Sequence, residues 1–367
     1  MGVILENTKR HLSENATAGS TASGNIATLN RVILPVIRRV MPTVIANELV
    51  GVQPMTGPVG QIHTLRVRYA DSMTDNSLAA TSTTAGEEAL SPFKIATAYS
   101  NNAGTATGYG GGNTAVLEGT AGNKISVQIL KQPVEAKTRK LSARWTFEAA
   151  QDAQAMHGID VEAEIMAALA QEITAEIDQE ILLSLRTLAA TEFTYNQAAV
   201  SGTATFVGDE HAALAVLINR TANLIAQRTR RGAGNYAVVS PASLTVLQSA
   251  TTSAFARTTE GTFEAPTNTK FVGTLNGTMR VFVDSYAADT QAVLVGYKGA
   301  SETDAPAFYC PYVPLMSSGV VLDPSTFEPV VSFMTRYGYI ELSNTASSFG
   351  NAGDYVGEIA VSNLSFS

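Results

Sequence analysis

Residues Asp160–Arg186 read DVEAEIMAALAQEITAEIDQEILLSLR. An aspartate that can cap a helix precedes acidic residues, which suit the positive end of a helix dipole. The apolar residues recur every fourth position: Ile165, Leu169, Ile173, Ile177, Ile181 and Leu185. Because the helical period is 3.6 residues, this row drifts about 40° around the axis at each step. The stretch therefore predicts a helix over about 160–187 that crosses several partners in succession.

The same helix is strongly acidic, whereas the segment before it is basic. An acidic run is most often a solvated face, and an acid–base or metal site is another possibility. A third interpretation is that basic residues of one copy pair with the acidic helix of a neighbour. The basic residues in this hypothesis are Arg38, Arg39, Arg66, Arg68, Lys131, Lys137, Arg139 and Lys140, and the acidic ones are Glu172, Glu176 and Glu180. Exposed pairs of this kind would set register more than affinity, since each contributes less than about 1 kcal/mol.

Two alternating runs flank a long irregular segment upstream of the helix. Leu65–Tyr69 alternates apolar and basic residues, and a second alternation begins at Ile125. Such alternation is typical of strands. The span 71–124 contains YSNNAGTATGYGGGNTAV and little that could form a core. So long a loop is unusual inside a compact domain. We therefore expect an extended hairpin over 61–140 that reaches away from the body.

The region after the long helix predicts a mixed α and β structure. A second amphipathic helix runs from Asp209 to about Arg231, where Gly232 is a natural stop. Short strands follow at 236–240, 271–275, 279–283 and 292–297, with a hairpin turn at Asn276-Gly277 and a helix after Pro241. Two strand-like segments, AFYCPYVPL and TRYGYIEL, come later in the chain.

Composition narrows the class of protein. The chain has 367 residues, of which only 15% are charged, and a net charge of −8. A surface so poor in charge suggests extensive contact with other protein, and an acidic chain does not attract nucleic acid or anionic membrane by a general field. Cys310 is the only cysteine, which excludes an intrachain disulfide. The start lacks the apolar run of a signal peptide, and no stretch approaches a membrane span.

No motif in the sequence predicts catalysis or cofactor binding. The four histidines share no metal-binding spacing, and neither a nucleophile elbow nor a phosphate-binding loop occurs. Arg228-Thr229-Arg230-Arg231 could contact nucleic acid or another subunit, but basic residues also suit the last turn of a helix. Trp145 is interpreted as a core anchor. We therefore expect no catalytic, cofactor or metal residues and a chain that is not an enzyme.

Four ordered stretches resemble the major capsid proteins of T-even-type tailed bacteriophages. They are RRVMPTVIANELVGVQPMTGPVGQI (38–62), AKTRKLSARWTFEAAQDAQAMHGIDVEAEI (136–165), IAQRTRRGAGNYAVVS (225–240), and the group VLVGYKG, FYCPYVPL and DPSTFEPVVSFMTRYG (293–338). The similarity runs from about Ile33 to Gly338. Ordered matches over most of the chain are a more specific signal than any single motif.

This resemblance implies an α+β, HK97-like capsid fold. The implied parts are an N-terminal arm and connector (1–60), an extended loop hairpin (61–140), a peripheral domain with the spine helix (141–204 and 312–367) and an axial domain (205–311). The chain is shorter than the T-even proteins and has no room for their insertion domain. The family also cuts its N-terminal segment after a [Leu/Ile]-x-Glu pattern, which places candidate cleavage sites after Glu6 and Glu14.

The implied function is a major capsid protein that self-assembles into an icosahedral head around double-stranded DNA. The implied partners are other copies in hexamers and pentamers, together with portal, scaffold and cement or vertex proteins. Assembly is expected in the host cytoplasm, without a membrane, and the product is the virion capsid. The alternatives are a dedicated vertex subunit of the same fold, a cellular nanocompartment shell and, from another class, a hydrolase that uses the acidic helix.

Overall fold

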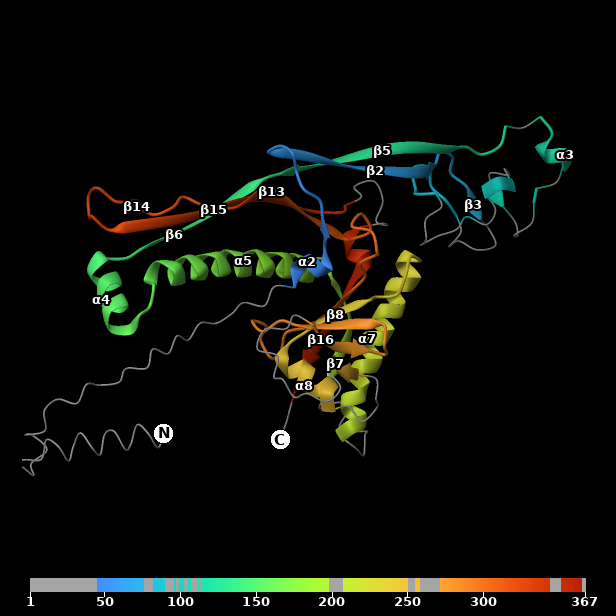
Figure 1. Ribbon diagram of the computed structural model, residues 1–367. Helices are drawn as coiled ribbons and strands as arrows, with labels where there is room; N and C mark the ends of the chain where they lie inside the picture. The colour runs from blue at the N-terminus through green and yellow to red at the C-terminus, as the bar shows by residue number, and fades with distance from the viewer. Residues whose placement is uncertain are drawn as a thin grey trace, which may run out of the picture.

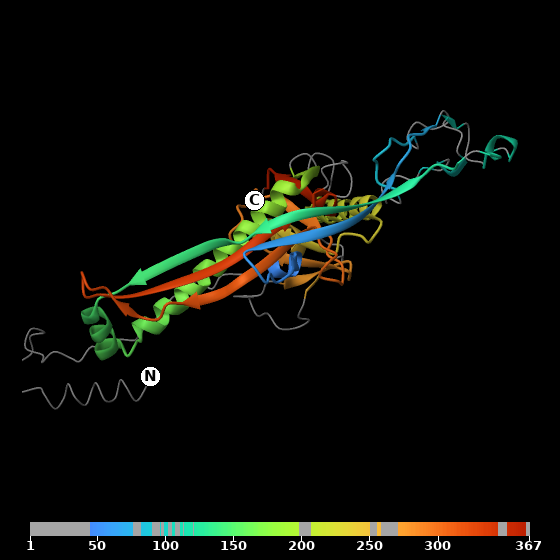
Figure 2. The ribbon, with the colours of Figure 1, turned by 90° about the horizontal axis from the view of Figure 1, so that it is seen from above.

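The computed structural model describes residues 45–75, 82–89, 96, 99–101, 105–106, 111–112, 114–119, 121–197, 207–249, 255–257, 271–343 and 351–364. The predictions for the contacts of Arg38 and Arg39 and for cleavage after Glu6 and Glu14 concern residues outside these ranges. The described chain is elongated, with a long helix under a sheet, a body below, and a projecting hairpin (Figures 1 and 2).

The long helix α5 (Val161–Leu188) confirms the prediction made from its apolar row. The side chain of Asp160 caps it by accepting the N–H groups of Glu162 and Ala163 at 3.1 and 3.4 Å. The row is buried unevenly: Leu169, Ile173, Ile181 and Leu185 are buried, whereas Ile165 and Ile177 are only partly buried. Burial therefore does not change steadily along the row, as drift around a 3.6-residue helix alone would predict, but depends on which neighbour each residue meets.

An elongated five-stranded sheet lies along α5. Its strands are β1 (Gly51–Val52), β13 (Ala307–Ser317), β15 (Pro329–Glu341), β14 (Val321–Leu322) and β6 (Lys137–Arg144), and both β14 and β6 pair with β15. The two strand-like segments of the sequence therefore form β13 and β15. The short helix α4 (Phe147–His157) leads from β6 into α5 at the far end of this sheet (Figure 1).

A seven-stranded sheet forms the body. Its order is β7 (Ala190–Asn196), β16 (Val356–Ser362), β12 (Val293–Gly296), β8 (Tyr236–Val239), β11 (Met279–Val283), β10 (Phe271–Leu275) and β9 (Phe255–Arg257). The strands predicted between 236 and 297 are all present. β7 and β16 also belong to this sheet, although they lie outside the 205–311 range predicted for the axial domain.

Helices cover both faces of the seven-stranded sheet. The central strand β8 places Ala237 and Val239 in the core shared with α7 (Val207–Thr229), and α8 (Pro241–Ser249) contributes to the same core. It places Tyr236 and Val238 in a second core with the C-terminal half of α5. Alternate residues of a strand point to opposite faces, so a strand buried on both sides is apolar throughout.

The helix α7 ends slightly earlier than predicted. Its last residue is Thr229, and Arg230, with φ 48°, takes the left-handed conformation that the prediction gave to Gly232. Gly232 meets a different requirement, because a Cβ there would lie 2.7 Å from the ring of Tyr297. Close packing, and not the helix end, therefore requires glycine at 232.

The predicted hairpin is formed by β2 (Val59–Tyr69) and β5 (Ile125–Glu135), paired antiparallel along their whole length. The prediction that 71–124 holds almost no core is wrong in one respect. Tyr69, Met73, Ala89 and Tyr99 form a small buried cluster at the tip. The tip also contains β3 (Thr74–Asp75) paired with β4 (Thr105–Ala106), the short helix η3 (Tyr99–Asn101) and α3 (Thr114–Leu117).

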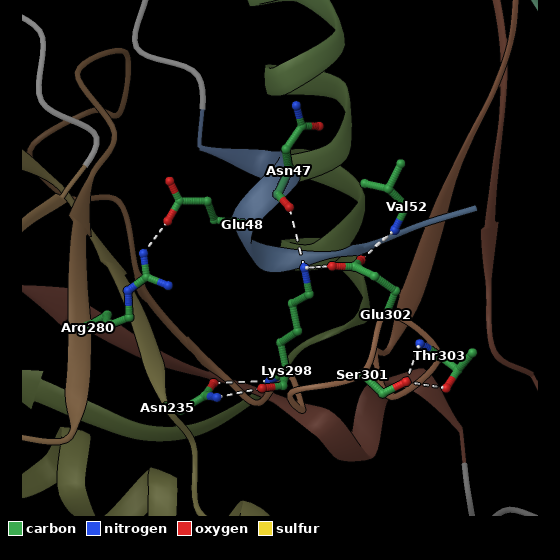
Figure 3. A network of polar contacts seen from close by, with 9 residues as sticks. All are labelled: Asn47, Glu48, Val52, Asn235, Arg280, Lys298, Ser301, Glu302 and Thr303. Carbon is green, nitrogen blue, oxygen red and sulfur yellow. Dashed lines mark hydrogen bonds and ion pairs between the residues drawn. The ribbon is translucent and has the colours of Figure 1, made fainter. Parts of the chain in front are cut away.

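The remaining short elements join the parts. The helix α2 (Ala46–Leu49) lies against α5, and η4 (Ala352–Tyr355) precedes β16. Figure 3 shows how α2 and β1 are held to the body: Arg280 forms an ion pair with Glu48, and Lys298 binds the carbonyl of Asn47 at 3.5 Å. Glu302 accepts the N–H of Val52 at 2.9 Å. In the described part of the chain, every helix is too short or too polar to cross a membrane.

Candidate subunit-contact surfaces

Arg139 was predicted to reach the acidic helix of a neighbouring copy, but it binds the helix of its own chain. From β6 its guanidinium lies 2.6 Å from Glu176 and 2.6 Å from Glu180 on α5. Its Nε donates to the hydroxyl of Tyr337 at 2.6 Å, and that hydroxyl in turn donates to Glu180. The predicted charge pairing is therefore present, but it fastens the spine helix to the sheet within one subunit.

The environment of this cluster perturbs its titration. Burial works against the charged form of Glu180, but hydrogen bonds from Tyr337 and Arg139 outweigh it and lower the pKa of Glu180. Burial and the hydrogen bond to Glu180 raise the pKa of Tyr337 to about 12. The cluster thus consists of a carboxylate, a phenol and a guanidinium at neutral pH, which suits a structural link.

Arg66 and Arg68 are buried within the chain, and Arg66 pairs with an acid of the same chain. Both are buried at the base of the hairpin tip. The guanidinium of Arg66 lies 2.6 Å from Glu88, in the segment that runs beside β2. A neighbour cannot reach these two side chains without opening the tip, so their predicted role in subunit contacts needs correction.

The other predicted contact residues remain open to solvent. Lys131, Lys137, Lys140 and Glu172 are exposed. Within the described ranges they form no ion pair, so these four stay available for a second copy. They lie along the outer strands and helix of the elongated half of the molecule.

The basic run at the end of α7 is neutralised by acids of the same chain. Arg228 lies 2.5 Å from Glu192, and Arg231 lies 2.7 Å from Asp304. Arg230 is exposed. Neither a nucleic-acid patch nor a subunit salt bridge is needed to explain the paired residues, but only Arg228 lies in the last turn of α7, where the helix-end interpretation placed the run.

An apolar stripe on the hairpin is a further candidate contact surface, which the charge-based hypothesis did not include. Leu65, Val127 and Ile129 are 67, 65 and 67% exposed. Leu65 pairs with Ile129, and Val67 pairs with Val127, so these side chains share one face of the hairpin. The alternation in the sequence contained this signal, and no part of the chain that the structure describes covers this face.

The far end of the elongated sheet is apolar as well. Trp145 was predicted to be a core anchor, but it is only partly buried, because α4 and the β14–β15 turn do not close over it. Phe147 and Phe327 are exposed beside it, with ring centroids 5.8 Å apart.

A cavity of about 610 Å³ lies between the base of the hairpin and the body. Its charged residues pair with one another: Arg66 with Glu88, and Arg231 with Asp304. Burial raises the pKa of Cys310, which keeps this lining thiol protonated and a poor nucleophile. Within the described residues no group of three His, Cys, Asp or Glu side chains could hold a metal.

Comparison with known proteins matches nearly the whole chain to one family. The model of the Major capsid protein Gp23 family matches residues 26–361. The major capsid protein of Vibrio phage KVP40 is 30% identical over 418 aligned positions, covering 91% of this chain and 81% of the relative. That of Enterobacteria phage T4 is 31% identical and covers 88% of this chain and 77% of the relative. These matches do not favour a vertex subunit or a nanocompartment shell.

Solved structures give the same fold at low sequence identity. The capsid of cyanophage P-SCSP1u aligns with a TM-score of 0.53 at 12% identity, covering 93% of this chain and 94% of that one. The capsid of Myoviridae phage XM1 aligns with a TM-score of 0.51 at 10% identity, covering 94% of this chain and 100% of that one. The α+β architecture with a spine helix and a projecting hairpin is the HK97-like capsid fold. The chain therefore belongs to the Gp23 family of major capsid proteins of tailed bacteriophages.

Proposed function

We propose that copies of this chain form hexamers and pentamers that close into an icosahedral shell around double-stranded DNA, with no catalytic step. The observation that carries this proposal is the hairpin. An isolated two-stranded hairpin is marginal in water, and this one exposes Leu65, Val127 and Ile129 on one face. Covering that face with a neighbouring copy would stabilise both partners. The apolar face of the hairpin would therefore be buried only in the assembled shell.

The same proposal assigns roles to the parts of the chain. Residues 1–60 act as arm and connector, 61–140 as the extended loop, 141–204 with 312–367 as the peripheral domain and 205–311 as the axial domain. The exposed Lys131, Lys137 and Lys140, together with Arg38 and Arg39 of the arm, set register against acidic surfaces of neighbours, including Glu172. The net charge of −8 suits an enclosure that does not bind DNA specifically.

A role in a head shell implies further protein partners. We propose that a portal, a scaffold and cement or vertex proteins act with this chain, and that assembly takes place in the host cytoplasm. Low charge supports extensive protein contact, since only 15% of residues are charged.

Negative-stain microscopy of the purified chain, expressed alone and with its scaffold, tests the proposal. We expect closed, regular particles whose mass is dominated by this polypeptide. A chain that stays monomeric under both conditions and turns over a substrate would overturn the structural role. Counting copies per particle by gel densitometry separates a shell subunit from a minority vertex subunit.

A further inference from the structure

The end of the molecule opposite the hairpin tip carries an apolar patch. Its residues belong to α4, to β14 with the residue before it, and to the β14–β15 turn. Figure 2 shows these elements at that end of the backbone. We call this apolar surface the distal patch. Its exposed apolar members are Phe147, Met156, Val320, Val321, Leu322 and Phe327. Burying these side chains in a partner would release water from a surface that no described part of the chain covers.

Phe327 is the most prominent member of the distal patch. Its side chain is 71% exposed, and its φ of 57° is unusual for a bulky residue. The turn that presents it is pinned: Phe327 donates its N–H to the carbonyl of Asp323 at 2.8 Å, and Asp323 accepts the hydroxyl and N–H of Ser325 at 2.7 and 2.9 Å. A strained backbone that holds an aromatic ring in water is a reason to look for a function.

A pocket of about 370 Å³ lies next to this ring. Most of its lining is apolar: Trp145, Phe147, Ala150, Ile159, Val161, Val320, Leu322 and Pro329. Gln154, Asp160 and Glu162 also line it. A cavity of about 150 Å³ already holds a benzene ring. The pocket is therefore large enough for a phenylalanine side chain. Phe327 does not fill the pocket of its own chain, since it is not among the lining residues and stays largely exposed.

We propose that the side chain of Phe327 of one copy inserts into this pocket of a second copy. This inference rests on the proposed function, because it requires copies to meet in a shell. The occupant is argued from self-complementarity: the knob and the hole lie on the same chain, so each copy can offer one and receive the other. A rigid aromatic anchor in an apolar pocket is the usual form of an interface hot spot.

The charges around the distal patch support the same partner. Arg144 at its rim is 70% exposed, although its guanidinium lies 3.7 Å from Glu328 of the same chain. The exposed carboxylates of Glu148 and Asp152 lie on α4. A surface with both signs of charge around an apolar centre is complementary to a copy of itself. A partner of one dominant charge would match only half of this rim.

Two single-cysteine variants provide the test, and the chain suits it because Cys310 is its only cysteine and is buried. Phe327→Cys supplies the knob and Gln154→Cys the rim of the pocket. The two variants are assembled together and the shells are oxidised. Each chain then has one accessible thiol, so a disulfide between positions 327 and 154 can form only between copies. Tyr286→Cys, at another exposed aromatic residue, replaces Phe327→Cys in the control.

We expect a disulfide-linked dimer in the mixed shells, several-fold above the level in the Tyr286→Cys control. Peptide mass spectrometry should assign the link to positions 327 and 154. Shells that form normally without this link, or that link 327 to 327, would overturn the insertion while leaving the shell function intact. Should Phe327→Cys prevent assembly, the same mixture is prepared with added wild-type chain, and the same two outcomes decide.

A second variant pair gives an independent measurement. Phe327→Ala should lower the temperature at which shells disrupt, and Phe327→Leu should recover most of that loss because it restores an apolar knob. The unassembled wild-type and variant subunits should unfold at the same temperature, since the exposed ring contributes little to the stability of an isolated copy. Equal shell stability for all three proteins would contradict the proposal, as would a distal patch occupied by a different virion protein.

Discussion

Asp178 shows how one buried charge joins distant parts of the chain. Its carboxylate on α5 accepts the N–H groups of Ile45 and Ala46 at 2.9 and 2.6 Å, and it is 1% exposed. The side chain of Ile45 cannot cap α2. Asp178, which lies 132 positions after Ala46 in the sequence, supplies the missing acceptor. The pairing ties the entry of the chain to the spine helix.

Replacing Asp178 with alanine should destabilise the unassembled subunit by about 1.5–3 kcal/mol, because two buried donors lose a charged acceptor. Asp178→Asn should lose less, since the amide oxygen still accepts. Urea unfolding followed by circular dichroism measures both. Glu172→Gln, an exposed change on the same helix, serves as control and should stay within about 0.5 kcal/mol. An Asp178→Ala protein as stable as this control would refute the capping role.

The Arg139–Tyr337–Glu180 cluster makes the folding stability of the subunit depend on pH. The pKa of Glu180 is lower in the folded chain than the unfolded value of about 4.3, so folding favours the ionised form. Its contribution is fully present above the unfolded pKa and is lost as pH falls through the folded pKa. Partial exposure limits it to under about 1 kcal/mol.

Glu180→Gln should therefore be less stable than wild type at neutral pH, and the difference should shrink at pH values below about 4. Unfolding of the unassembled chain at several pH values gives this comparison. Glu172→Gln again provides a carboxylate without such partners. A difference between wild type and Glu180→Gln that grows on acidification would contradict the sign argued here.

At the level of elements, the base of the hairpin depends on close packing against β15. A Cβ on Gly338 would lie 2.6 Å from Cγ2 of Val134 and 3.2 Å from the carbonyl of Glu135. Gly338→Ala should cost about 1–3 kcal/mol, because β5 and β15 must separate. Gly122→Ala, where nothing lies within 4 Å, is the control and should be nearly neutral. Denaturant unfolding of both variants measures the effect, and equal stability would show that the crossing is loose.

The elements that the sequence predicted well are those whose apolar residues recur at a regular spacing. The row from Ile165 to Leu185 predicted α5, and the alternation at Leu65 and Ile125 predicted the hairpin. The cluster at the tip could not be predicted in this way. Tyr69, Met73, Ala89 and Tyr99 are spread over thirty positions without a repeat, so only the folded chain brings them together.

The candidate contact residues were predicted less well than the elements. The charge pattern predicted that Arg139 pairs with the acidic helix of a neighbour, but Arg139 pairs with that helix in its own chain, a distinction that the pattern does not contain. Arg66 found Glu88 within its own tip for the same reason. Charge pairing is decided by three-dimensional proximity, whereas the exposed apolar face of the hairpin follows directly from strand alternation.

The whole molecule separates folding from assembly. Two cores hold the body and the spine helix together, whereas the described residues of one copy leave the hairpin face and the distal patch exposed. Substitutions in the cores should therefore lower subunit stability and assembly together. Substitutions on the uncovered surfaces should affect assembly alone.

Val127→Asp tests this separation on the hairpin. Val127 is 65% exposed, so the change should alter the stability of the unassembled subunit by no more than about 1 kcal/mol, the range of strand preferences. A buried, unpaired carboxylate at a subunit contact is far more costly, so shells should fail to form or dissociate at lower temperature. Val127→Leu keeps the surface apolar and should assemble like wild type. Differential scanning calorimetry of subunits and shells measures both quantities. If Val127→Asp shells were as stable as those of Val127→Leu, the hairpin face would not be a contact.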